Sequence, residues 1–135
     1  MPLLVDTGVL YALADRRDAW HHRVRRYLEG TRQTLLAPVT ILPEVAYLLR
    51  ERIGTHAERA LVASLVKGEI AVEEPTARDW ARVEALMDKY EILGLVDASV
   101  VAIAERLKLD TIATTDRRDF SVVRPVHVER FTLAP

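Results

Sequence analysis

The feature that most constrains the fold of this chain is an alternation of short apolar segments with longer amphipathic segments. The first apolar segment, Leu3–Val5, is three residues long, and such a run suits a strand that is buried on both faces. A segment with helical spacing of apolar residues follows it directly, and this order recurs along the chain. Short apolar strands that alternate with helices predict an α/β fold, with a parallel sheet covered by helices on both sides.

The alternation gives approximate bounds for each element. Strands are predicted at Leu3–Val5, Leu35–Ala37, Ile70–Val72, Thr111–Thr115 and Val126–Val128. Helices are predicted at Gly8–Ala14, at Ala19–Leu28, after an N-cap at Thr40 as far as Arg52, around Leu61 to Val66, at Thr76–Tyr90 and at Asp97–Leu107. We find no repeat, linker or low-complexity tract, so residues 1–135 are expected to form a single domain.

Composition excludes several classes of function. The net charge of −1 gives the whole molecule no general attraction to nucleic acid or membrane. The absence of cysteine excludes disulfides and thiolate metal sites. No apolar run approaches the ~20 residues that span a bilayer. The amino-terminal residues lack the basic segment of a signal peptide, so we expect no membrane partner and a cytoplasmic location.

Two aspartates follow predicted strands. Asp6 comes directly after Leu3–Val5, and Asp116 comes directly after Thr111–Thr115. Ligands of parallel α/β sheets bind at the carboxyl ends of the strands, so the two carboxylates meet there if their strands are neighbours. The alternative for Asp116 is a turn residue that opens the loop TDRRDF.

Two further acids lie on or beside the apolar faces of predicted helices. Glu44 is three residues after Ile41 and four before Leu48, which places it at the edge of an apolar stripe. Asp97 begins the series Asp97, Val100, Val101, Ala104, which is the buried face of its helix. The alternatives are an N-cap role for Asp97 and an interaction with the helix dipole for Glu44.

Clustered carboxylates repel one another, and burial of each ion costs several kcal/mol unless protons or a cation neutralise it. Oxygen ligands alone select hard cations such as Mg²⁺ or Mn²⁺. Mg²⁺ is typically held by one or two carboxylates together with phosphate oxygens of a substrate. This combination indicates metal-assisted hydrolysis of a phosphodiester.

The sequence resembles the PIN-domain ribonucleases, specifically the VapC-like toxins, in four segments: LLVDTGVLYAL, TILPEVAYLLR, LVDASVVAIAERL and ATTDRRDF. The resemblance implies a three-layer α/β/α sandwich with a five-stranded parallel sheet of order 3-2-1-4-5. It also implies that Asp6, Glu44, Asp97 and Asp116 form an acidic centre for Mg²⁺ or Mn²⁺, with Glu44 either a ligand or oriented toward the attacking water. An RNA substrate, a homodimer and a cognate antitoxin protein are implied by the same resemblance.

Three more residues are candidates for this centre. Thr114 shares a strand face with Asp116, so its hydroxyl either positions a carboxylate or belongs to an ordinary strand residue. Thr7 either contacts the metal site or caps the first helix. Asp119 is a fifth acid of the centre or a solvated loop residue.

A basic rim is expected around the acidic centre. Arg117 and Arg118 directly follow Asp116, and Arg23 and Arg26 extend the rim unless they form a solvated helix face. Guanidinium groups bind phosphate with two parallel hydrogen bonds, which suits RNA. His21 and His22 are interpreted as surface residues, and the aromatic residues of three helices are interpreted as core residues: Trp20, Tyr47 and Trp80.

Three other functions fit parts of the pattern. A haloacid-dehalogenase-type phosphatase needs a second acid two residues after Asp6, where this chain has Gly8. A response-regulator-like domain needs paired acids before the first strand's aspartate and a late lysine, and neither is present. A PIN-fold RNA-binding or scaffold module without turnover stays open, although the complete set of acids argues against it.

Overall fold

A five-stranded parallel sheet forms the centre of the computed structural model, which describes all residues from Met1 to Pro135. Its strands are β1 (Leu3–Val5), β2 (Leu35–Pro38), β3 (Ile70–Glu73), β4 (Thr111–Ala113) and β5 (Thr132–Ala134). They run in the order β3-β2-β1-β4-β5, and every neighbouring pair is parallel. The predicted fold class and strand order are therefore confirmed.

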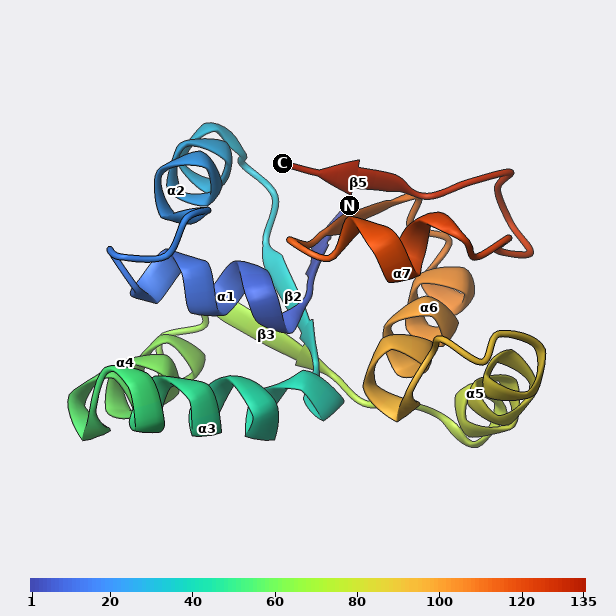
Figure 1. Ribbon diagram of the computed structural model, residues 1–135, viewed down its shortest axis with the longest axis horizontal. Coiled ribbons are helices and arrows are strands. Elements are labelled where there is room, and N and C mark those ends of the chain that lie inside the picture. The colour runs from blue at the N-terminus through green and yellow to red at the C-terminus, as the bar shows by residue number, and fades with distance from the viewer.

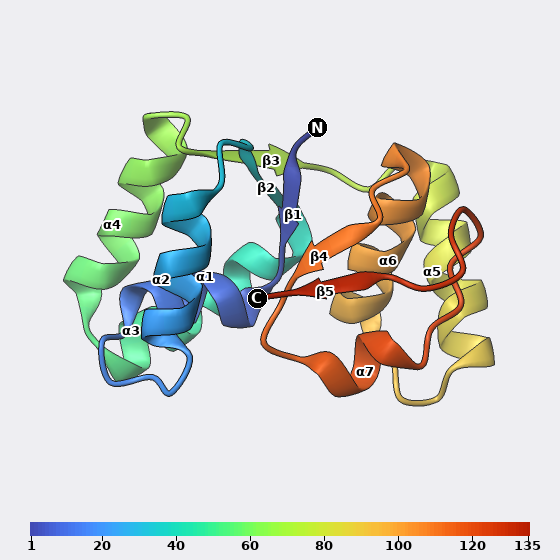
Figure 2. The same ribbon diagram turned by 90° about the horizontal axis from the view of Figure 1, so that it is seen from above.

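Helices cover both faces of the sheet. They are α1 (Thr7–Ala14), α2 (His21–Gly30), α3 (Leu42–Arg52), α4 (Thr55–Val66), α5 (Ala77–Lys89), α6 (Leu95–Leu107) and α7 (Arg117–Ser121), with a short 3₁₀ helix η1 (Val39–Ile41) before α3. Figures 1 and 2 show α1 to α4 on one side of the sheet and α5 to α7 on the other. No helix combines the length and the apolar character that a membrane span requires.

The core fixes the elements that will carry the acidic residues. All three residues of β1 are buried, as the continuous apolar segment predicts. Helix α6 is buried without interruption from Ala98 to Glu105. Because this buried stretch starts one residue after Asp97, the packing of α6 against the sheet holds Asp97 at the edge of the core.

The last strand is displaced from its predicted position. Val126–Val128 is not a strand, and β5 instead pairs with β4 from Thr132 onward. Two contacts hold the earlier segment elsewhere: Val126 N donates to Glu105 Oε2 at 2.9 Å, and His127 Nε2 lies 2.7 Å from the carbonyl oxygen of Leu109. An edge strand pairs with only one neighbour, and here Thr132–Ala134 fills that place beside β4. The apolar alternation at Val126–Val128 therefore did not identify the edge strand.

Four other predictions are wrong. Thr40 is not an N-cap; it lies inside η1, and its hydroxyl is 2.6 Å from Ser99 Oγ on α6. His21 is buried, and its Nδ1 lies 2.8 Å from the carbonyl oxygen of Ala12. Tyr47 and Trp80 are 64% and 43% exposed, so neither is a core residue. Trp20 is half-buried against the core, which agrees with its interpretation.

Candidate metal centre

An acidic hollow of about 470 Å³ opens where the carboxyl ends of β1 and β4 meet the first turns of α3 and α6. It is lined by the four acids that the sequence singled out, Asp6, Glu44, Asp97 and Asp116, together with Thr7, Gly8, Gly94, Leu95, Val96 and Thr115. The four acids come from four separate segments of the chain. The fold therefore brings together carboxylates that are up to 110 residues apart in the sequence.

Asp6 is the most deeply placed of these acids, with 5% of its surface exposed. Its backbone N donates to the carbonyl oxygen of Ala113, which continues the pairing of β1 with β4. Burial raises the pKa of Asp6 to about 6, although hydrogen bonds from Thr7 N and Thr114 oppose the shift. The negative charges of Glu44 and Asp116 raise this pKa further.

Thr114 links two of the acids directly. Its buried hydroxyl donates to Asp6 Oδ2 at 3.1 Å and accepts from Asp116 N at 2.9 Å. The side chain therefore fixes the Asp6 carboxylate relative to the loop that carries Asp116. Thr114 is not an ordinary strand residue, because both capacities of its hydroxyl are used inside the acidic centre.

Asp97 lies at the third position of α6, whose N-cap is Gly94. The N-cap alternative for Asp97 is therefore wrong, and its side chain makes no capping bond. Burial raises the pKa of Asp97 to about 7, and the charges of Asp6, Asp116 and Asp119 add to the rise. A carboxyl with this pKa is half-protonated near neutral pH unless a cation takes the place of the proton.

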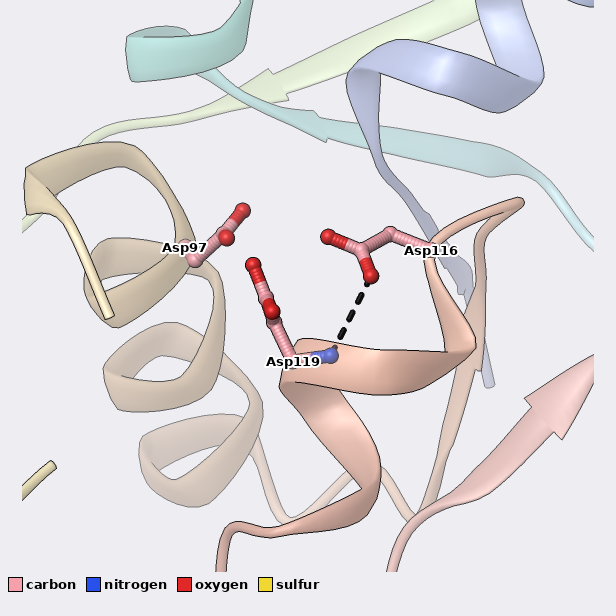
Figure 3. Close-up of side chains that lie close together, drawn as sticks. All are labelled: Asp97, Asp116 and Asp119. Atoms are coloured by element: carbon pink, nitrogen blue, oxygen red, sulfur yellow. Dashed lines mark hydrogen bonds between the residues drawn. The ribbon is translucent and has the colours of Figure 1, made fainter. Parts of the chain in front are cut away.

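Asp119 belongs to the same cluster. Carboxylate oxygens of Asp97, Asp116 and Asp119 all lie within 4.8 Å of one another, and Figure 3 shows the three side chains pointing toward a shared space. Asp119 N donates to Asp116 Oδ1 at 3.1 Å, so Asp116 also caps α7. Burial and the charge of Asp116 raise the pKa of Asp119. The solvated-loop alternative does not describe its position.

Glu44 differs from the other acids in exposure. It lies in the first turn of α3 with its side chain toward solvent, not within the buried stripe. It still lines the hollow, and its charge contributes to the raised pKa of Asp6. Glu44 therefore occupies the mouth of the hollow, where it can reach both solvent and the inner acids.

Sequence reasoning missed the contact between Gly8 and Thr115. A Cβ atom at Gly8 would overlap Thr115 Oγ1, so glycine is what allows the Thr115 hydroxyl to reach the hollow. These residues are 107 positions apart, and no local pattern indicates their contact. Thr7 Oγ1 is also buried in the lining and has no hydrogen-bond partner. An unpartnered buried hydroxyl beside carboxylates is available to a water molecule, an ion or an oxygen of a substrate.

No arginine or lysine neutralises this centre. The five ion pairs of the protein join Arg25, Arg50, Arg82 and Arg106 to acids outside the hollow. Burial, and then the charges of the neighbouring acids, raise the pKa values of Asp6 and Asp97. Carboxylate and hydroxyl oxygens form the whole polar side-chain lining, a donor set that fits a hard divalent cation.

The predicted basic residues lie on α2 and at the start of α7. Arg117 and Arg118 are exposed at the start of α7, directly after Asp116. The guanidinium groups of Arg23 and Arg117 lie 4.8 and 5.9 Å from the centroid of the Trp20 ring. Arg26 joins Arg23 in lining a separate hollow of about 450 Å³ on α2. None of the four arginines forms an ion pair.

Comparison with known proteins agrees with this geometry. Residues 3–124 match the model of the PIN domain family. Ribonuclease VapC26 of Mycobacterium tuberculosis is 30% identical over 135 residues, which cover 98% of this chain and 100% of that protein. These matches leave no place for the phosphatase and response-regulator alternatives.

Solved structures share the fold. VapC20 of Mycobacterium tuberculosis, described as a sarcin-ricin loop cleaving toxin, superposes with a TM-score of 0.83 at 25% identity, over 94% of this chain and 98% of that one. A toxin–antitoxin complex from Klebsiella pneumoniae gives 0.71 at 22% identity, over 96% and 99%. The extent of the PIN domain match and the identity to a VapC ribonuclease show that this chain belongs to the PIN domain family, as a VapC-like ribonuclease.

Proposed function

We propose that this protein hydrolyses phosphodiester bonds in RNA with Mg²⁺ or Mn²⁺ held in the acidic hollow, and that it is the toxin of a toxin–antitoxin pair. One observation carries the proposal: four carboxylates line a single hollow, a fifth from Asp119 lies beside two of them, and none of the five forms an ion pair with a basic side chain. Such a cluster is costly unless a cation completes it.

Asp6, Asp97, Asp116 and Asp119 would hold the cation, either directly or through water. The bound cation would lower the pKa of a water molecule and stabilise the negative charge that develops on the phosphate. Thr114 holds Asp6 and the Asp116 loop in register, as its two hydrogen bonds indicate. Glu44 at the mouth is placed to orient the attacking water. The free hydroxyl of Thr7 is placed to bond to a water or phosphate oxygen in the hollow.

Arg117, Arg118, Arg23 and Arg26 would bind the phosphates that flank the cleaved bond. Arg118, Arg23 and Arg26 are exposed and form no ion pair, so their charges are available. Trp20 supports this arrangement, because its ring contacts the guanidinium groups of both Arg23 and Arg117. Arg117 also donates to the carbonyl oxygen of Pro135, which restrains its position next to Asp116.

The proposed partners are a cognate antitoxin and a second copy of the chain, in the cytoplasm. One structural relative is a toxin–antitoxin complex, which supports the first partner. The outer face of α4 supports the second, because Val62 and Val66 are 53% and 82% exposed there without a covering element.

The test is to sequence the RNA ends that purified protein generates with Mg²⁺ or Mn²⁺. We expect discrete cleavage sites that vanish with EDTA and with Asp97→Asn, and that persist with Asp88→Asn, which removes an exposed acid of α5. RNA binding without new ends in any metal would contradict the proposal and favour a PIN-fold binding module without turnover.

A further inference from the structure

Another hollow, of about 540 Å³, lies at the carboxyl-terminal ends of α1 and α3, whereas the acidic centre lies at their amino-terminal ends. It is lined by Arg16, Arg17, Arg52 and His56, together with Ala14, Asp15 and Ile53. The arginine and histidine side chains come from three places: the segment after α1, the last residue of α3 and the first turn of α4. We call this set of residues the basic hollow. Its charges are brought together by the fold, not by a run in the sequence.

The buried side chain of Tyr11 contacts two residues that line the basic hollow, Asp15 and Arg52. This buried residue donates from its hydroxyl to Asp15 Oδ2 at 2.5 Å, while Arg17 N donates to Asp15 Oδ1 at 2.9 Å. The hydrogen bond from Tyr11 lowers the pKa of Asp15, so its carboxylate stays ionised and both of its oxygens are occupied. The guanidinium of Arg52 lies 5.2 Å from the centroid of the Tyr11 ring. Tyr11 therefore contacts both the segment after α1 and the end of α3.

The charge of the basic hollow is not balanced within the protein. Three guanidinium groups face one carboxylate, which leaves a net charge of +2 before His56 is counted. None of the three arginines forms an ion pair. By contrast, Arg50, two residues from Arg52 on the same helix, is paired with Glu58 at 2.8 Å. Unpaired arginines that converge on a hollow are suited to phosphate oxygens.

We propose that the basic hollow binds phosphate groups of the RNA substrate several nucleotides from the cleaved bond. This inference rests on the proposed function. Both α1 and α3 start at the acidic hollow, with Thr7 and Glu44, and end at the basic hollow, with Ala14 and Arg52. The two helices lie side by side in Figure 1. At 1.5 Å of rise per residue, Glu44 and Arg52 are separated by about 12 Å along α3. One RNA strand can therefore contact both hollows.

The chemistry of the lining favours RNA over an acidic protein segment. Protein interfaces are anchored by buried aromatic and large apolar side chains, whereas the only apolar lining residues here are Ala14 and Ile53. The acidic centre also repels a polyanion until a cation is bound. A basic site outside that centre supplies attraction for the substrate that the net charge of the whole chain does not.

The experiment measures binding of a fluorescein-labelled RNA decamer by anisotropy in EDTA, which stops metal-dependent cleavage, at several salt concentrations. We expect Arg52→Gln to weaken binding about 3-fold and Arg17→Gln with Arg52→Gln about 10-fold, with the salt slope reduced by about 0.7 for each lost phosphate contact. Arg52→Lys should keep most of the affinity. The matched control, Arg50→Gln, should bind as the unchanged protein does. A labelled dinucleotide, too short to span both hollows, should not distinguish the variants.

Three results would overturn the inference. The first is equal decamer affinity for Arg52→Gln and Arg50→Gln in variants whose melting temperatures match. The second is unchanged decamer affinity with weakened binding of a poly-glutamate peptide, which would assign the basic hollow to an acidic protein. The third is unchanged decamer affinity with weakened binding of inorganic phosphate, which would assign the basic hollow to a free anion.

The same variants separate this inference from the proposed function. Metal-dependent cleavage by a protein whose Arg52 does not affect RNA binding would remove the basic hollow from the substrate path and leave the activity intact. Arginine-dependent decamer binding without cleavage in any metal would reject the proposed ribonuclease activity and support the basic hollow as an RNA site.

Discussion

Two groups of carboxylates in this protein include buried members, and they are neutralised in different ways. Between α5 and α6, Arg82 donates from Nε and Nη2 to the two oxygens of Glu105, at 2.7 and 3.0 Å. Arg106 donates from Nε to Asp79 at 2.8 Å and also contacts Glu73. Each buried acid of this group therefore has a guanidinium partner. The acids of the hollow have only hydroxyl and backbone partners from the rest of the chain.

This difference distinguishes the acids that stabilise the fold from the acids of the proposed metal site. Asp79 is 3% exposed and Asp6 is 5% exposed, so burial alone does not distinguish the groups. The charges of the paired acids are neutralised by arginines of the folded protein, and these ion pairs join α5 to α6. The charges of the acids in the hollow need a proton or a cation to neutralise them. Burial accordingly raises the pKa of Asp97 to about 7 in the metal-free protein. The same substitution should therefore have opposite consequences in the two groups.

The largest expected effect is on catalysis. Asp6→Asn or Asp97→Asn should reduce Mn²⁺-dependent RNA cleavage by about 10³-fold, because each removes a charge from the proposed metal site. Circular dichroism should show that the fold is retained. Cleavage within a few-fold of the unchanged protein would remove the aspartate from the assigned role and erase the distinction between the two groups.

The next effect concerns the paired group. Glu105→Gln should lower the free energy of unfolding by about 2 kcal/mol, since it leaves Arg82 without its anionic partner and Arg82 is only about a third exposed. Urea unfolding measures this, and Glu84→Gln, an exposed acid of α5, is the control. RNA cleavage should stay unchanged under folding conditions. Equal stability of the two variants would mean that the pairs between α5 and α6 are not structural.

The third effect depends on pH. The pKa of Asp97 is raised in the folded protein, so the unfolded chain loses this proton near pH 4 and the folded chain near pH 7. Between these values the unfolded state binds fewer protons, and the stability of metal-free protein falls as pH rises. Asp97→Asn should therefore be more stable than the unchanged protein at pH 7.5 in EDTA, by about 1 kcal/mol.

That advantage should shrink as the pH falls from 7.5 toward 4, because the folded chain then holds the Asp97 proton that neutralises the buried carboxyl. Thermal melts at the two pH values provide the measurement. A lower melting temperature for Asp97→Asn at pH 7.5 would contradict the crowding of carboxylates from which the metal site is inferred.

The smallest effect concerns the rim. Arg117→Ala should weaken RNA binding a few-fold and reduce the salt slope by about 0.7, because one phosphate contact is lost. Arg78→Ala, which removes an exposed charge from α5, should leave the slope unchanged. A slope for Arg117→Ala equal to that of the unchanged protein would remove this arginine from the RNA interface.

The sequence predicted the parts of the molecule that depend on local pattern. The buried strand Leu3–Val5 and the phase of Asp97 on α6 follow from the spacing of apolar residues, and both are found in the structure. Strand order and the acidic quartet followed from family resemblance. The sequence does not decide whether Asp119 belongs to the cluster, because its position depends on the packing of α7 against α6.

Features that depend on distant contacts were not predictable. His21 reads as a surface residue, yet its ring bonds to the backbone of Ala12 and is buried. Tyr47 has helical spacing with apolar residues but faces solvent, because no element covers that side of α3. The contact of Gly8 with Thr115 has no local signal either. Each depends on which segments the sheet places side by side.

The central claim is that the acids of the hollow share one divalent cation site, and calorimetric titration with Mn²⁺ tests it most directly. At pH 6.5 the account expects saturable binding that releases protons, because Asp6 and Asp97 are partly protonated there. Asp97→Asn should abolish most of this binding, and Asp79→Asn, in the paired group, should leave it intact. Equal Mn²⁺ binding by Asp97→Asn and the unchanged protein would contradict the account.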